Sequence, residues 1–84
     1  MNEIETWIAD YLRREGKAGD ADLEALADAN FVEHGLMDSL GIVMLVVDIE
    51  VEFGTRIASD QMQDPRFATI RGLAEIVSEA RAAA

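Results

Sequence analysis

The chain has 84 residues, with 17 acidic side chains against 7 basic ones and a formal charge of −10, which repels nucleic-acid phosphates and argues against a nucleic-acid partner. A chain of this length forms one domain, here expected to span residues 1–84, and has little room for an enclosed substrate cavity. Cysteine is absent, and the N-terminus has no basic and apolar leader, so we expect a cytoplasmic protein. The apolar run "GIVMLVV" is far shorter than the roughly 20 residues that span a bilayer, so we expect no membrane insertion.

The first predicted element is an amphipathic helix that ends near Gly16. Acids at its start, and Arg13 and Arg14 near its end, complement the helix dipole. Apolar side chains recur along it at the i, i+3, i+4, i+7 spacing of one helix face. These predicted core residues are Ile4, Trp7, Ile8, Tyr11 and Leu12.

Residues 16–35 show a weaker pattern and are expected to form a loop with at most a helical turn or two. The residues that should anchor this loop in the core are Leu23, Leu26 and Phe31. Asp20, Asp22 and Glu24 have the spacing of a calcium loop, but Ala25 and Phe31 stand where that loop needs a glycine and a bidentate glutamate. We therefore expect a solvated acidic surface and no metal site.

The run "DSLGIVMLVVDIEVEFG", residues 38–54, is apolar on two sides. Its valines and isoleucines would also suit a strand, but its length, the Asp-Ser start and Gly54 at the end favour a helix. One stripe should face the core: Ile42, Leu45, Ile49 and Phe53. A second stripe lies beside it: Leu40, Val43, Val47 and Val51. Such a helix is either central in a bundle or presents one stripe to a partner.

After Gly54, the segment "TRIASDQMQ" is predicted to be a connecting loop, with Ile57 and Met62 as its core anchors. "DPRFA" fits a short helical turn, because proline is accepted at the first helical position after an aspartate cap. The last helix follows Thr69, and its core residues are Ile70, Leu73, Ile76 and Val77. The chain is therefore predicted to be all-α, with three main helices and one short helix.

Ser39 lies where the polar stretch gives way to the long apolar run. A nucleophilic serine needs a base, and the only histidine is His34 in the preceding loop. The nucleophile-elbow pattern G-x-S-x-G is half present, since Met37 replaces its first glycine and Gly41 matches the second. We expect no enzyme activity of the chain's own. Asp38 or Ser39 can instead cap the following helix.

The stretch "GLMDSLG", residues 35–41, resembles the phosphopantetheine attachment site of the acyl carrier protein family. The resemblance extends over the first helix, the loop with Phe31 and Gly35, the helix that closes on "EVEFG", and the ending "FATIRGLAEIV". It implies a small four-helix bundle of the acyl-carrier-protein type and a monomer.

The resemblance also implies a site. A phosphopantetheinyl transferase would attach 4′-phosphopantetheine from coenzyme A to Ser39, and the terminal thiol would carry an acyl or aminoacyl thioester. Asp38 would help to hold the metal or the interface at the transferase, and His34 would be a nearby loop residue. Partner enzymes would read an apolar stripe with acidic residues around it: Leu40, Val43, Met44 and Val47, with Asp48, Glu50 and Glu52.

The kind of carrier follows from two further stretches. The turns after Ser39, "LGIVMLVV", lack the acids frequent in fatty-acid carriers, whereas "RFATIRGLAEIV" resembles the ending of peptidyl, aminoacyl and D-alanyl carrier proteins. With Met1 and no flanking linker, we expect a free-standing carrier of an aminoacyl or specialised acyl group. An acyl- or aminoacyl-activating ligase would load it, and downstream acyl-transferring or modifying enzymes would receive the cargo. The alternatives are a fatty-acid or polyketide carrier, and an unmodified acidic helical interaction module.

Overall fold

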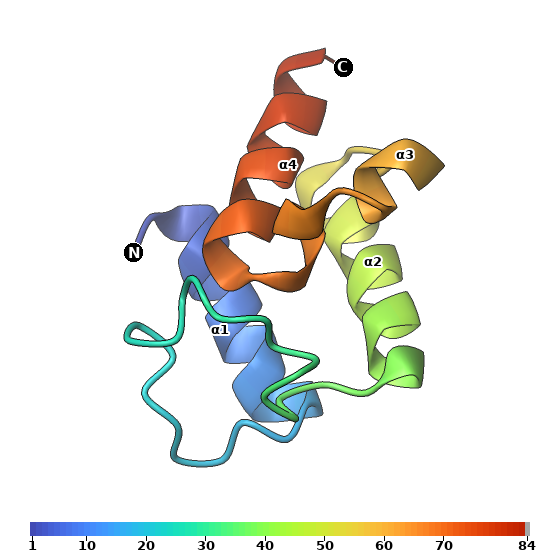
Figure 1. Ribbon diagram of the computed structural model, residues 1–84. Coiled ribbons are helices and arrows are strands. Elements are labelled where there is room, and N and C mark those ends of the chain that lie inside the picture. Colours follow the sequence, from blue (N-terminus) through green and yellow to red (C-terminus); the bar gives the residue numbers. More distant parts are fainter. Residues whose placement is uncertain (84) are drawn as a thin grey trace.

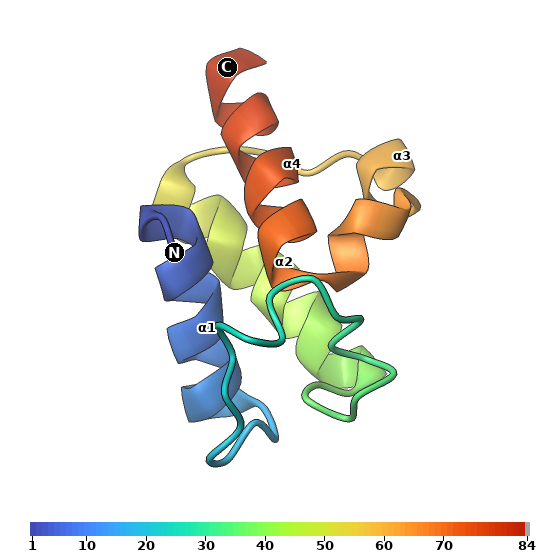
Figure 2. The ribbon, with the colours of Figure 1, turned by 60° about the vertical axis from the view of Figure 1, so that its left-hand side comes forward.

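The computed structural model describes residues 1–83, and every regular element in that range is a helix (Figure 1). The elements, in chain order, are α1 (Glu3–Glu15), α2 (Ser39–Phe53), α3 (Ser59–Met62), the 3-10 helix η1 (Pro65–Ala68) and α4 (Ile70–Ala83). Helix α4 packs against α1 and η1, and α2 makes fewer backbone contacts with α4 (Figures 1 and 2). The prediction of a small all-α bundle with three long helices is confirmed.

Helix α1 begins with a reciprocal cap. The Asn2 side chain accepts the Glu5 N–H at 2.8 Å, and the Glu5 carboxylate accepts the Asn2 N–H at 3.0 Å. The helix ends at Gly16, as the sequence predicted. Trp7 is half-buried, with its ring centroid 5.4 Å from those of Tyr11 and Phe53, so it joins α1 to the end of α2.

The long segment between α1 and α2 contains turns and no helix. Leu23 and Phe31 are fully buried, and Leu26 packs partly against the core, which confirms all three as anchors. Two backbone hydrogen bonds hold this loop against the junction of η1 and α4: the Phe31 N–H donates to the Ala68 carbonyl at 2.8 Å, and the Arg71 N–H donates to the Ala27 carbonyl at 2.9 Å. The loop is therefore part of the packed structure and leads the chain to a defined start of α2.

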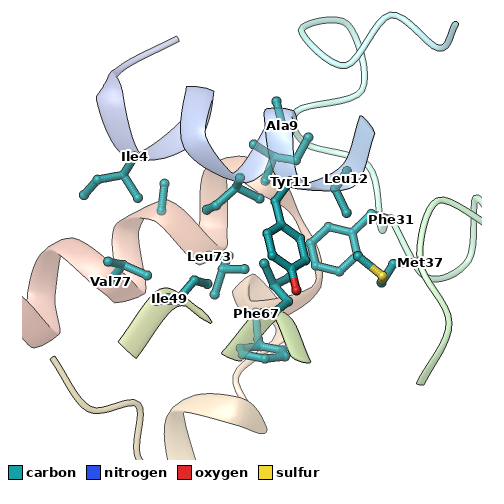
Figure 3. Close-up of a cluster of buried hydrophobic side chains, with 14 of the residues drawn as sticks. Ile4, Ala9, Tyr11, Leu12, Phe31, Met37, Ile49, Phe67, Leu73 and Val77 are labelled. Atoms are coloured by element: carbon teal, nitrogen blue, oxygen red, sulfur yellow. The ribbon is translucent and has the colours of Figure 1, made fainter. Parts of the chain in front are cut away.

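The core collects apolar side chains from all three long helices and from the loop (Figure 3). From α2, Leu45 and Ile49 are fully buried, while Ile42 and Phe53 are partly buried against the core, so the predicted inner stripe is confirmed. Val46 is also buried, although neither predicted stripe includes it. None of the helices in residues 1–83 is both long and apolar enough to cross a bilayer.

The segment after Gly54 corrects two predictions. Residues 59–62, expected to be loop, form the short helix α3, whose start is supported by the Gln61 side chain accepting the Ala58 N–H at 2.8 Å. Ile57 is buried as expected, but Met62 is 40% exposed and is not a core anchor. Met62 instead lines an open groove beside α2, together with Val46 and Phe67.

Arg66 fastens η1 to α4. Its guanidinium donates to Asp64 at 3.0 Å and to Glu79 at 2.8 Å, and it lies 3.4 Å from Glu75. Hydrogen bonds from Arg66 hold the pKa values of the Asp64 and Glu79 carboxyls below their usual range. In both ribbon views the start of α2 and the end of α4 lie at opposite ends of the molecule (Figures 1 and 2).

Candidate functional site

The site is built around the first turn of α2. Asp38 adopts an extended backbone conformation just before the helix, and its Oδ1 atom accepts the Gly41 N–H at 2.8 Å. The Asp38 carbonyl accepts the Ile42 N–H at 3.0 Å, which begins the regular helical pattern. Of the two residues that the sequence offered as caps, Asp38 is therefore the one that forms the cap. At the other end, Gly54 closes α2 in the left-handed conformation, with φ of 62°.

Ser39 is the first residue of α2 and is exposed. Because Asp38 occupies the Gly41 N–H, the N–H groups of Ser39 and Leu40 have no partner among residues 1–83 and are available to an anion at the helix N-terminus. His34 is exposed in the preceding loop, where its backbone N–H donates to Asn30. Its ring makes no hydrogen bond to Ser39 within the described part of the chain, so no serine-histidine pair is assembled there.

Met37 packs beneath the first turn of α2, on its buried side. Its side chain is only 3% exposed and fills the space beside Gly41, where a Cβ atom would lie 2.1 Å from the Met37 sulfur. The sequence had shown Met37 only as the residue that breaks a hydrolase motif. Met37 lies in the loop before α2, outside any periodic pattern, so the sequence alone did not predict its burial.

The outer stripe of α2 is open to solvent. Leu40 is 73% exposed and Val51 79%, and the side chains between them on this face, Val43, Met44 and Val47, are also exposed. The three acids named with this face differ in their surroundings. Glu52 is exposed, whereas Glu50 is partly buried and accepts the Ile57 N–H at 2.9 Å.

Asp48, the third acid, is engaged with α1. Its Oδ2 atom accepts a 2.7 Å hydrogen bond from the hydroxyl of Tyr11, whose side chain is almost fully buried. Burial, together with this hydrogen bond and the neighbouring negative charge, raises the pKa of Tyr11 to about 12. Asp48 and Glu50 therefore both stabilise the position of α2 in the isolated chain.

Two depressions flank α2. Between α1 and α2 lies an open hollow of about 440 Å³ with an acidic rim, lined by Tyr11, Glu15, Asp38, Leu40, Gly41, Met44 and Asp48. On the other flank lies a groove of about 340 Å³ that is lined by apolar residues alone: Ile42, Val43, Val46, Val47, Met62 and Phe67. The exposed stripe runs between a polar and an apolar depression.

The first turn of α2 has the chemistry that a phosphate ester on Ser39 requires. The hydroxyl is exposed, two N–H groups are available beside it, and the positive end of the helix dipole favours a negative charge by about 0.3–1 kcal/mol. Lys17, from the turn after α1, lies with its Nζ atom 3.8 Å from Asp38 Oδ2. No sequence pattern indicated this lysine, because the long loop separates it from the motif. These residues therefore fit a phosphopantetheine group, which the Ser39 hydroxyl would hold.

Comparisons with known proteins agree with this geometry. The family model described as "phosphopantetheine attachment site" matches residues 4–77, which include all of α1 but its first residue, all of α2 and the first half of α4. The curated proteins and the solved structures gave no match to the chain. Members of the matched family carry covalently attached 4′-phosphopantetheine. Because the match covers most of the 84 residues, the chain belongs to the family of phosphopantetheine-attachment domains, of which acyl carrier proteins are members.

Proposed function

We propose that this protein carries an acyl or aminoacyl group as a thioester on a phosphopantetheine arm attached to Ser39. The observation that supports Ser39 most strongly is its position: it is the exposed first residue of α2, next to the cap that Asp38 forms. The arm supplies a flexible thiol, and the chain itself needs no catalytic base, because a phosphopantetheinyl transferase performs the attachment.

The exposed stripe of α2 is the proposed docking face for partner enzymes. Large apolar side chains with about half or more of their surface exposed are costly to leave in water, and here they follow one side of a single helix. Glu52 lies exposed at the end of α2, and Asp48 and Glu50 lie on the same helix, each accepting one hydrogen bond from within the protein. A partner with a basic rim around an apolar depression would complement this face.

The proposed cargo is an aminoacyl or specialised acyl group. The first turn of α2 has no acidic residue, in contrast to fatty-acid carriers, and the C-terminal sequence resembles that of aminoacyl carriers. The proposed partners are accordingly an acyl- or aminoacyl-activating ligase and downstream transferring or modifying enzymes. A fatty-acid or polyketide role is the alternative within the same family.

Intact-mass measurement tests the attachment. The protein and its Ser39→Ala variant are incubated with coenzyme A, magnesium and a broad-specificity phosphopantetheinyl transferase. The wild type should gain one phosphopantetheine group and the variant none. Since Asp38 forms the cap, Ser39→Ala should change the free energy of unfolding by less than about 0.5 kcal/mol.

A folded wild type that gains no mass, under conditions that modify another carrier, would overturn the proposal. It would favour the unmodified interaction module, in which α2 binds a partner and Ser39 is only part of the helix start. If the mass gain occurs, the phosphopantetheine-modified protein can be incubated with activating ligases and with amino-acid or fatty-acid substrates. Charging by amino acids alone would support the aminoacyl assignment.

A further inference from the structure

Lys17 is brought to the attachment site by the way the turn after α1 packs. Its backbone N–H donates to the Leu36 carbonyl at 2.8 Å, so this turn is hydrogen-bonded to the end of the loop that leads into α2. The preceding residue, Gly16, allows this approach, because a Cβ atom there would lie 2.5 Å from the Leu36 carbonyl oxygen. The position of Lys17 beside the site thus depends on backbone contacts and not on its flexible side chain alone.

The side chain of Lys17 then reaches Asp38. Its Nζ atom lies 3.8 Å from Asp38 Oδ2, and both side chains remain largely in solvent, at 70% and 58% exposed. An exposed ion pair of this length adds little to stability, so the pair is a weak explanation for a cation at this position. The capping bond uses the other carboxylate oxygen, Oδ1, and would persist if the ammonium moved away.

Two arginines form ion pairs that join separate segments of the chain. Arg66 is bonded to Asp64 and Glu79, and Arg71 contacts Asp28 and Glu5. Lys17 is the only lysine of the chain and contacts the residue next to Ser39. A phosphodiester on Ser39 would add a negative charge beside Asp38 in a chain that already has a formal charge of −10. A cation within reach of that phosphate would offset the repulsion.

We propose that Lys17 is the counter-charge of the phosphodiester on Ser39. In the unmodified protein its ammonium faces Asp38, and in the modified protein it contacts the phosphate, together with the free N–H groups at the start of α2. Since this role rests on Ser39 as the attachment residue, the test separates the two proposals.

The experiment compares Lys17→Gln and Lys17→Arg with Arg56→Gln. Arg56 is exposed beyond the opposite end of α2, so its replacement makes the same change in net charge away from the site. Each protein is modified with phosphopantetheine, and attachment is verified by mass. The readouts are the ³¹P chemical shift of the phosphodiester, the ¹³Cε shift of Lys17 before and after modification, and the change in thermal midpoint on modification at low and high salt.

In the wild type, modification should move the Lys17 ¹³Cε resonance. Lys17→Gln should shift the ³¹P resonance and make modification more destabilising at low salt, and high salt should remove that difference, because exposed charges are screened. Lys17→Arg should restore the wild-type behaviour, and Arg56→Gln should match the wild type. Identical ³¹P shifts and midpoint changes in all variants would overturn the role of Lys17 while leaving Ser39 in place. Absence of any mass gain in the wild type would instead overturn the proposed function, and the role of Lys17 with it.

Discussion

The hydroxyl of Tyr11 in α1 donates a 2.7 Å hydrogen bond to Asp48 in the middle of α2. Burial and this bond raise the pKa of Tyr11 to about 12, whereas an unfolded chain titrates its tyrosine near 10 (about the model-peptide value). A raised folded-state pKa means that the stabilisation is complete below the unfolded pKa and is lost as the pH rises toward the folded one. Tyr11 is the only tyrosine, so phenolate absorbance reports on it alone. We expect it to ionise near pH 12 or together with unfolding; ionisation near 10 in folded protein would contradict the structure.

Tyr11→Phe should lower the free energy of unfolding by about 1 kcal/mol, since it removes one hydrogen bond and leaves Asp48 partly accessible to water. Urea denaturation at neutral pH measures this loss. Asp48→Asn is the matched control, because its amide oxygen can still accept the bond and the loss should be smaller. Equal losses in both variants would mean that the hydrogen bond stabilises the fold only when its acceptor is charged.

Gly41→Ala should destabilise the protein, because the new Cβ atom would lie 2.1 Å from the Met37 sulfur. Overpacking of this kind costs about 1–3 kcal/mol, and the better helix propensity of alanine offsets at most about 1 kcal/mol. Met37→Ala alone should also destabilise, by about 2–5 kcal/mol, because it empties a buried site.

The double variant Met37→Ala, Gly41→Ala identifies the cause. The added methyl group would enter the space that the methionine leaves. The loss of unfolding free energy in the double variant should therefore be smaller than the sum of the two single losses, by a coupling energy of about 0.5–3 kcal/mol. Strict additivity in thermal or urea unfolding would show that the two side chains do not share this space.

Asp38 caps α2 and also carries a carboxylate charge, and two substitutions separate the effects of the cap from those of the charge. Asp38→Asn keeps an oxygen that can accept the Gly41 N–H and should leave stability nearly unchanged, whereas Asp38→Ala should lose about 1 kcal/mol. If the transferase uses the carboxylate, both variants should be modified more slowly, by a similar factor. Initial rates of mass gain measure this. A normal rate for Asp38→Asn would restrict Asp38 to the role of cap.

Arg66→Met should lower the thermal midpoint at neutral pH, because Arg66 joins η1 to α4 through Asp64 and Glu79. Their lowered folded-state pKa values make this contribution present above the usual carboxyl pKa and lost as the pH falls through the folded values. The difference from wild type should thus be largest near neutrality and vanish in acid and at high salt. Arg56→Met, an exposed arginine without an ion pair in residues 1–83, is the control. A difference that persists in acid would assign the effect to the arginine's packing.

Val43 and Val46 are neighbours in α2 with opposite surroundings, at 58% and 8% exposed. Val46→Ala should cost about 1–2 kcal/mol of stability, since it removes buried methyl groups, while Val43→Ala should cost less than about 0.5 kcal/mol. Val43→Asp should keep the fold and raise the KM of the transferase reaction. A KM unchanged by that charge would exclude Val43 from the proposed docking face.

The sequence predicted α1 and α2 well because each has a strong local signal. Their apolar residues repeat with the helical period, and Asp38 and Gly54 mark the ends of α2. Helix α3 was missed because four residues show no period and Ala58 offers no capping oxygen. At the site, Ser39 and Asp38 are adjacent and visible in the sequence. The contacts of Lys17 with Asp38 and of Tyr11 with Asp48 join distant segments, so only the folded chain reveals them.

The start of α2 and the end of α4 face away from one another (Figures 1 and 2). A tether fixed after α4 would therefore leave the Ser39 end of the molecule pointing outward. The protein can be displayed on a bead, a sensor chip or a scaffold in this orientation, with the exposed stripe of α2 open to enzymes in solution. Immobilised arrays of this chain should accept the prosthetic group as readily as free protein, which makes them suited to screening for the enzyme that loads it.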